Sequence, residues 1–205
     1  MANVFSDLGS DEYKAIPRIL SVVSSLLERK VARNERLIVP CQKKLSRENL
    51  GVFSALQVPA MNIEKYLERI FKYARCSPSV FVVAYVYIDR LIFHIPGFHL
   101  TSLNVHRLVL TSVMVATKFL DGFHYNNDHF AKVGGLKLAK LNNLEVEFLF
   151  MLRFRLHVTA SGFESYCTYF HQIEVALGGG VQIEKALLCF SKTETDNSSR
   201  QLEEA

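Results

Sequence analysis

Two ionisable side chains lie where the sequence predicts apolar surface, and they are the residues best placed to do chemistry. Lys118 is in the apolar segment Leu108 to Gly122, and Glu145 is centred on an apolar face of the segment Lys137 to Leu156. A charge among apolar groups is costly unless an opposite charge or a hydrogen-bond donor meets it. Each residue therefore predicts either an internal ion pair, with Lys118 also able to offset a helix dipole, or part of a binding site. The spacing of residues along the helices does not decide between these alternatives.

Motifs for catalysis and for metal binding are absent from the sequence. The chain has no G-x-S-x-G elbow, no H-E-x-x-H pair and no G-x-x-x-x-G-K-[ST] loop. The pairs His94 with His99 and His124 with His129 flank predicted turns, and no cysteine or carboxylate completes a ligand set beside them. We therefore expect neither a metal nor a cofactor, and nothing in the sequence argues for an enzyme.

The composition is typical of a folded protein inside the cell. Of the 205 residues 49% are hydrophobic, and the formal charge of +4 is scattered among acids instead of forming a basic face. The four cysteines form no CxxC pair, and no secretory signal is visible at the N-terminus. The longest apolar run, Val80 to Ile88, is far shorter than the roughly 20 residues of a membrane span. We expect no membrane or direct nucleic-acid partner, and a location in the nucleus or cytoplasm.

Apolar residues recur at helical spacing along most of the chain, and no alternating strand pattern competes with them. The first helix starts at Ile16 and is expected to fade in the charged run Glu28 to Arg36. Gly134 and Gly135 are expected to form a left-handed helix end. Further helices are predicted over residues 62–74, 77–94, 101–120, 126–133, 137–156 and 161–177. The fold class is therefore all-α.

Four motifs, taken in order, resemble a cyclin box. They are Y-I-D-R over Tyr87 to Arg90, A-T-K-F over Ala116 to Phe119, A-K-V-G-G over Ala131 to Gly135 and L-N-x-L-E-x-x-F-L over Leu141 to Leu149. The chain is most similar to plant P-type or U-type cyclins and to phosphate-responsive yeast cyclins. The resemblance implies a single five-helix cyclin box around its third helix, with an N-terminal helix and a C-terminal extension helix. The expected boundaries are 1–61 for the N-terminal helix and linker, 62–157 for the box, 158–190 for the helical extension and 191–205 for a disordered tail.

The resemblance also assigns roles to particular residues. In cyclins, the lysine of the A-[ST]-K-F motif and the glutamate of the fifth box helix hydrogen-bond to a cyclin-dependent kinase, and these match Lys118 and Glu145. The aspartate of Y-I-D-R pairs inside the fold with an arginine of the first box helix, which implies a structural ion pair between Asp89 and Arg69. Spacing adds further kinase-binding candidates at the rim: Arg107, Thr111 and Asn104 share with Lys118 the least apolar face of the predicted helix over residues 101–120.

Taken together, these features predict a cyclin, a regulatory subunit without catalytic activity of its own. It is expected to form a heterodimer with a cyclin-dependent protein kinase and to activate it in cell-cycle or phosphate-nutrient control. The M-R-A-I-L segment, which docks substrates in cell-cycle cyclins, is missing, so we do not expect that activity. Two alternatives stay open: a cyclin-fold adaptor for transcription or signalling that activates no kinase, and a scaffold that holds a kinase inactive.

Overall fold

The protein is an α-helical bundle, seen in a computed structural model that describes residues 16–38, 51–121 and 125–176. All regular structure within these ranges is helical, which confirms the predicted fold class. The predicted tail and the part of the predicted extension beyond residue 176 lie outside the described residues. The helices are α1 Arg18–Ile38, α2 Ile63–Ala74, α3 Pro78–His94, α4 Val105–Leu120, α5 Asn127–Gly134, α6 Leu138–Met151 and α7 Ala160–Ala176.

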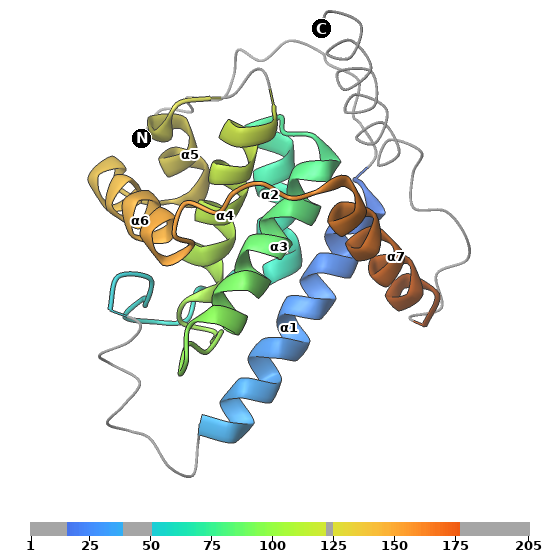
Figure 1. Cartoon of the computed structure of the whole chain (residues 1–205). Helices are drawn as coiled ribbons and strands as arrows, with labels where there is room; N and C mark the ends of the chain where they lie inside the picture. Colours follow the sequence, from blue (N-terminus) through green and yellow to red (C-terminus); the bar gives the residue numbers. More distant parts are fainter. Residues whose placement is uncertain (1–15, 39–50, 122–124, 177–205) are drawn as a thin grey trace, which may run out of the picture.

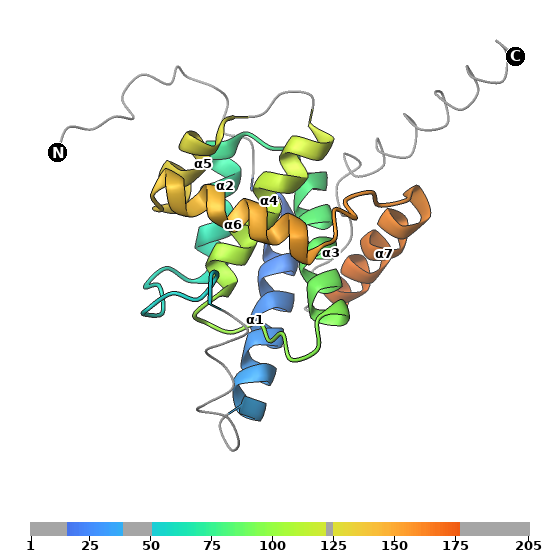
Figure 2. The same ribbon diagram turned by 60° about the vertical axis from the view of Figure 1, so that its left-hand side comes forward.

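The centre of the bundle is the pair formed by α3 and α4. Every residue from Val80 to Ile88 in α3 and from Leu108 to Thr117 in α4 is buried. The other helices surround this pair: α1 and α2 pack together on one side, and α6 crosses α4 next to α5 (Figures 1 and 2). The five helices α2 to α6 thus form the predicted bundle around its third helix, with α1 and α7 as the added terminal helices.

The helices α2, α3 and α5 each start at a polar N-cap residue. The side chain of Asn62 accepts a hydrogen bond from the Lys65 amide, and that of Asn126 accepts one from the His129 amide. Ser77 is the N-cap of α3, but its hydroxyl donates to Asp121 at the end of α4, over 2.9 Å. This bond joins the start of α3 to the end of α4.

The first, fourth and sixth helices differ from the predicted lengths, and α4 begins at Val105 instead of residue 101. α1 continues through the charged run to Ile38, because its apolar face packs on α2 and α3 and because Lys30 and Glu35 of the run bond to Asp89 and to the Ser102 amide. α6 ends at Met151 and not at Leu156, since Arg153 and Phe154 adopt positive φ angles of 52° and 56°.

The segment after α6 is held in place by α3. The Tyr87 hydroxyl donates to the Leu156 carbonyl over 2.8 Å. The Arg90 guanidinium donates to the Arg155 carbonyl over 2.7 Å and to the His157 carbonyl over 2.9 Å. These three bonds fix the turn that follows α6, and they compensate for its unfavourable backbone angles.

The two glycines at the end of α5 have different tasks. Gly135 is the predicted left-handed C-cap, with φ 69°. Gly134 is the last residue of α5, and a Cβ atom there would overlap with the side chain of Leu110, which is fully buried in α4. The absence of a side chain at Gly134 therefore allows α5 to approach α4 closely.

We expect Gly134→Ala to lower the free energy of unfolding by about 1–3 kcal/mol, because Leu110 cannot move away without disturbing the core. Gly51→Ala is the matched control, since a Cβ atom there meets nothing within 4 Å and should change stability by less than about 0.5 kcal/mol. Urea denaturation of both variants measures the difference. Equal midpoints would contradict the close approach.

His106 in α4 is a half-buried histidine that is held in its neutral form. Its Nε2 atom lies 2.7 Å from the Met61 carbonyl oxygen, which can only accept, so Nε2 carries the proton. Its Nδ1 atom is buried without a hydrogen-bond partner. Burial lowers the pKa of His106, because the imidazolium form would lose its hydration.

This lowered pKa predicts a stability that depends on pH. The unfolded chain takes up a proton at His106 below about pH 6.5 and the folded chain does so only at a lower pH, so stability falls as pH drops below about 6.5. His106→Gln removes this proton uptake, and its amide can still donate to Met61. We expect the free energy of unfolding to fall less steeply between about pH 6.5 and about pH 5 in the variant. Parallel curves for variant and wild type would show that His106 does not contribute.

Candidate functional site

Lys118 and Glu145 are in direct contact in the structure. Lys118 lies in the last turn of α4, and its Nζ atom is 2.6 Å from Oε1 of Glu145 in the middle of α6. The side chains are 29% and 17% exposed, respectively. The ion pair is therefore partly desolvated but still open to a partner molecule.

Two asparagines extend this pair into a network that sequence reasoning missed. Asn127, the first residue of α5, donates from Nδ2 to Oε2 of Glu145 over 2.6 Å and to Oδ1 of Asn142 over 2.8 Å. In the sequence Asn127 is one of two adjacent asparagines at the start of the helix predicted over residues 126–133. An asparagine is common at a helix start whether or not it contacts another helix, so nothing in the sequence indicates the contact of Asn127 with α6.

The network keeps unused hydrogen-bonding capacity on both charged groups. The ammonium group of Lys118 has three N–H donors, and the described residues take up one of them. Each carboxylate oxygen of Glu145 accepts one bond and can accept a second. The arrangement can therefore donate to a carbonyl oxygen and accept from an amide of a second protein at neighbouring points.

Exposed apolar side chains lie on the same two helices as the charged pair and just after α6. Phe119 follows Lys118 at the end of α4, and Val146 follows Glu145 on α6. Phe150 is 64% exposed, and its ring meets that of Phe154 edge to face with centroids 5.4 Å apart. Apolar groups gathered next to a polar pair are typical of protein-binding surfaces. We call the following residues the α4/α6 surface: Lys118, Glu145, Phe119, Leu138, Val146, Phe150 and Phe154.

Two of the predicted rim residues do not reach the surface. Asn104 and Thr111 are both 0% exposed. The side chain of Asn104 accepts from the Thr101 amide and donates to the His99 carbonyl, which closes the turn before α4. The Thr111 hydroxyl donates to a backbone carbonyl within α4. Their prediction as rim residues is wrong, because Thr111 lies in the stretch of α4 that is buried on all sides, Asn104 is buried in the turn before α4, and both side chains bond to nearby backbone.

The third rim candidate, Arg107, is half-buried and lies beside α6. Its guanidinium donates to the Ser54 carbonyl and so attaches the segment before α2 to α4. Partial burial and the positive charge of Arg107 both lower the pKa of Lys140 on α6. Arg107 thus borders the same helix as Glu145, and its place in a binding rim stays a prediction.

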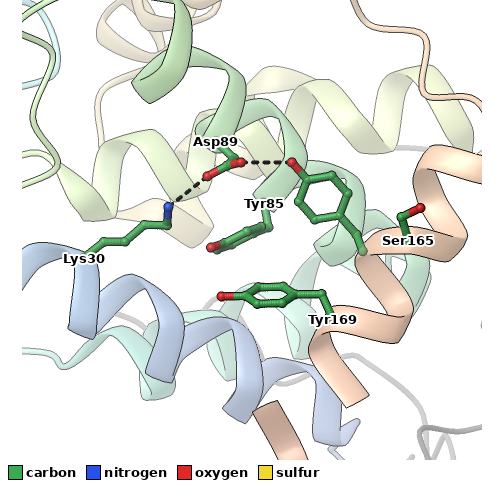
Figure 3. A pocket seen from close by; sticks show the side chains of 6 residues that line it. Lys30, Tyr85, Asp89, Ser165 and Tyr169 are labelled. Carbon is green, nitrogen blue, oxygen red and sulfur yellow. Dashed lines mark hydrogen bonds and ion pairs between the residues drawn. The ribbon is translucent and has the colours of Figure 1, made fainter. Parts of the chain in front are cut away.

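The predicted pair between Asp89 and Arg69 is wrong, because α1 supplies the cation. Asp89 accepts from Lys30 Nζ over 2.8 Å and from the Tyr166 hydroxyl over 2.9 Å (Figure 3). Arg69 instead donates to the Val133 carbonyl over 2.8 Å. α1 packs against α3, whereas this side of α2 faces α5. A first helix that fades from Glu28 would not bring Lys30 to Asp89.

Asp89 also lies in a pocket of about 390 Å³ between α1, α3 and α7. Burial and the Asp89 carboxylate together raise the pKa of Tyr166 to about 12, so its hydroxyl stays a hydrogen-bond donor at neutral pH. Figure 3 shows Tyr85 and Tyr169 facing each other below this pair. The lining residues are Lys30, Tyr85, Asp89, Ser165, Tyr166 and Tyr169.

Neither a metal cluster nor a membrane-spanning helix is found in the described part of the chain. No group of three or more His, Cys, Asp or Glu side chains there could hold a metal ion. Among the described helices, none has the length and apolar character needed to cross a membrane.

The revised pairing of Asp89 can be measured by double-mutant cycles. We expect a coupling of about 0.5–1 kcal/mol between Asp89→Ala and Lys30→Ala, because a third of each side chain is exposed and solvent weakens the pair. The cycle of Asp89→Ala with Arg69→Ala should show no coupling. Thermal unfolding of the single and double variants measures both terms. Coupling to Arg69 and none to Lys30 would contradict the observed contact.

Comparison with known proteins gives consistent matches over most of the chain. The family model for cyclins matches residues 17–156, so the match includes α1 as well as the segment that starts at residue 62. Cyclin-U2-1 of Arabidopsis thaliana is 48% identical over 193 residues, which cover 92% of this chain and 83% of the relative. Cyclin-U1-1 of Arabidopsis thaliana is 52% identical over 153 residues, 75% of this chain and 72% of the relative. Cyclin-P4-1 of Oryza sativa subsp. japonica is 46% identical over 154 residues, 75% and 73% of the two chains.

Proposed function

Because the chain belongs to the cyclin family, we propose that it binds and activates a cyclin-dependent protein kinase through the α4/α6 surface. Cyclins are regulatory subunits and not enzymes themselves. The observation that carries the proposal is the partly exposed pair of Lys118 and Glu145, which keeps free donors and acceptors on two helices that also carry exposed apolar side chains. We further propose residues 62–157 as the box and residues 158–190 as its helical extension.

The proposed mechanism follows from how protein kinases are switched on. A kinase is active only when a glutamate on its mobile helix pairs with the lysine that holds the ATP phosphates. A partner that presses this helix inward stabilises the active arrangement. The α4/α6 surface would press on it, with Lys118 donating to a kinase carbonyl and Glu145 accepting from a kinase amide.

The apolar and charged residues of this surface have different tasks in the proposed complex. Phe119, Val146 and Phe150 supply apolar area, which provides most of the binding free energy in protein interfaces. The charged pair fixes the register, because it is satisfied only where a donor and an acceptor of the kinase meet it. The cost of its partial desolvation is already met by the contact within the chain, so less is lost on binding.

The cellular setting of the proposed complex is the one implied by the resemblance to P-type and U-type cyclins. We propose a role in cell-cycle or phosphate-nutrient control, in the nucleus or cytoplasm. The relatives' names identify them as cyclins of these types and name no kinase.

We expect Lys118→Ala and Glu145→Ala each to weaken kinase binding by about 2–5 kcal/mol, because the remaining charge would be buried in the complex without its opposite charge. Kinase activation should be lost in parallel. The monomer should stay folded, since the pair is partly exposed and exposed pairs contribute about 1 kcal/mol or less. Calorimetric titration with purified plant cyclin-dependent kinases, a kinase assay and thermal unfolding measure the three effects.

A second ion pair in the chain provides the matched control. Lys132 and Asp128 pair one turn apart on α5 over 2.7 Å, with side chains 65% and 48% exposed. Lys132→Ala removes the same kind of charge from outside the α4/α6 surface and should bind and activate as wild type does. Wild-type binding and activation by both Lys118→Ala and Glu145→Ala would reject the proposed surface. Binding without activation by the wild-type protein would favour an adaptor or scaffold.

A further inference from the structure

We propose that Asn127 is a positioning residue, which aims the Glu145 carboxylate at the kinase and so acts on binding without touching the kinase itself. This inference rests on the proposed function of the α4/α6 surface. It concerns a residue on α5, the short helix that contributes no side chain to that surface. The observation behind it is the hydrogen bond of 2.6 Å from Asn127 to the oxygen of Glu145 that Lys118 does not hold.

The chemistry of the contact decides which way the amide of Asn127 points. A carboxylate can only accept hydrogen bonds, so the atom 2.6 Å from Oε2 of Glu145 must be the NH₂ group. The second N–H of this group donates to Oδ1 of Asn142, 2.8 Å away. Both N–H donors of Asn127 are therefore used on α6, and its amide has one orientation that satisfies both bonds.

The position of Asn127 is fixed by the contacts of α5. It is the first residue of α5, directly after the cap formed by Asn126. Two residues further on, the ring of His129 bonds to the Tyr73 carbonyl of α2 over 2.7 Å and stacks on Tyr125 with centroids 3.9 Å apart. Gly134 seats the other end of α5 against α4. The helix thus holds the amide in place from both ends.

This arrangement determines the geometry of the Glu145 carboxylate. Lys118 holds one oxygen from α4 and Asn127 holds the other from α5, so the plane of the group cannot rotate. Without Asn127, the carboxylate keeps one anchor, and its free acceptor sites lose a defined direction. A charged group that must be ordered during binding binds more weakly than one ordered beforehand.

The test replaces Asn127 by the residue closest to it in shape. Asn127→Asp puts a carboxylate against Glu145 where the amide donated, and an acid in the first turn suits the helix dipole of α5. We expect kinase binding to weaken about tenfold or more, as for other hydrogen bonds to charged groups. Asn127→Ala should also weaken kinase binding. Asn142→Ala should weaken it less, because the bond from Asn127 to Glu145 remains in that variant.

Asn143 on α6, the helix of Glu145, offers a matched control. Its side chain is exposed on the opposite face of α6 and makes no hydrogen bond or ion pair with other described residues. Asn143→Asp changes the net charge of the chain as Asn127→Asp does, and it should bind within about twofold of wild type. The binding constants are measured by calorimetry with the purified plant cyclin-dependent kinase that binds the wild-type protein.

Dependence on pH separates positioning from a merely structural role. Two carboxyl groups facing each other at this distance can share a proton, and the shared proton restores a hydrogen bond. We therefore expect the affinity of Asn127→Asp to recover as pH is lowered from about 8 to about 5.5. The alanine variant has no group to protonate and should show no such recovery relative to wild type.

Three outcomes would overturn the inference, and each differs from failure of the proposed function. Wild-type affinity of Asn127→Asp and Asn127→Ala, combined with loss of binding in Lys118→Ala, would leave the surface in place without a role for Asn127. Loss of binding in step with a large drop in melting temperature would show that Asn127 is structural. Absence of recovery at low pH would show that the donated hydrogen bond does not matter. Failure of the proposed function itself would show as wild-type affinity of Lys118→Ala and Glu145→Ala.

Discussion

The fold is built on a helix that is surrounded by others, and this fixes where the protein can carry a charge. Residues 108–117 of α4 are buried without a break, so a lysine within them would lie in the core without hydration. Lys118 follows directly, in the last turn, where the helix reaches the surface and the helix dipole favours a cation. The end of α4 is also bonded to the start of α3 through Asp121 and Ser77. The charge therefore sits at a fixed point on the edge of the core.

Glu145 shows that an internal ion pair and a binding site need not be alternatives. The sequence presents them as competing explanations, because both place a carboxylate on an apolar face. In the structure the carboxylate bonds to two helices and still has acceptor sites open to solvent. Contacts within the chain reduce the cost of holding charges in a half-apolar region, and they leave those charges ordered for a partner. The same atoms therefore form the internal ion pair and remain available to bind a partner.

The sequence predicts the helices and their buried faces well, and it predicts contacts between polar groups of different helices poorly. Periodicity identifies the core helix and its emerging lysine, because burial depends on one helix at a time. It also marks Asn104 and Thr111 as the polar side of α4, but that side is covered, and both groups bond to nearby backbone. The partners Lys30 and Asn127 depend on how α1 and α5 pack against other helices. Other lysines and asparagines of the chain would fit the helical sequence pattern equally well.

The Y-I-D-R segment shows how a motif can support a surface to which it contributes no residue. Within one turn of α3, Tyr87 and Arg90 bind three backbone carbonyls after α6, while Asp89 binds Lys30 of α1 and Tyr166 of α7. The turn after α6 needs this support, because two successive residues there have positive φ angles. One of them is Phe154, whose ring packs on Phe150 at the edge of the α4/α6 surface. The motif thus fixes the apolar edge of that surface from inside the fold, as Asn127 fixes its charged centre from the side.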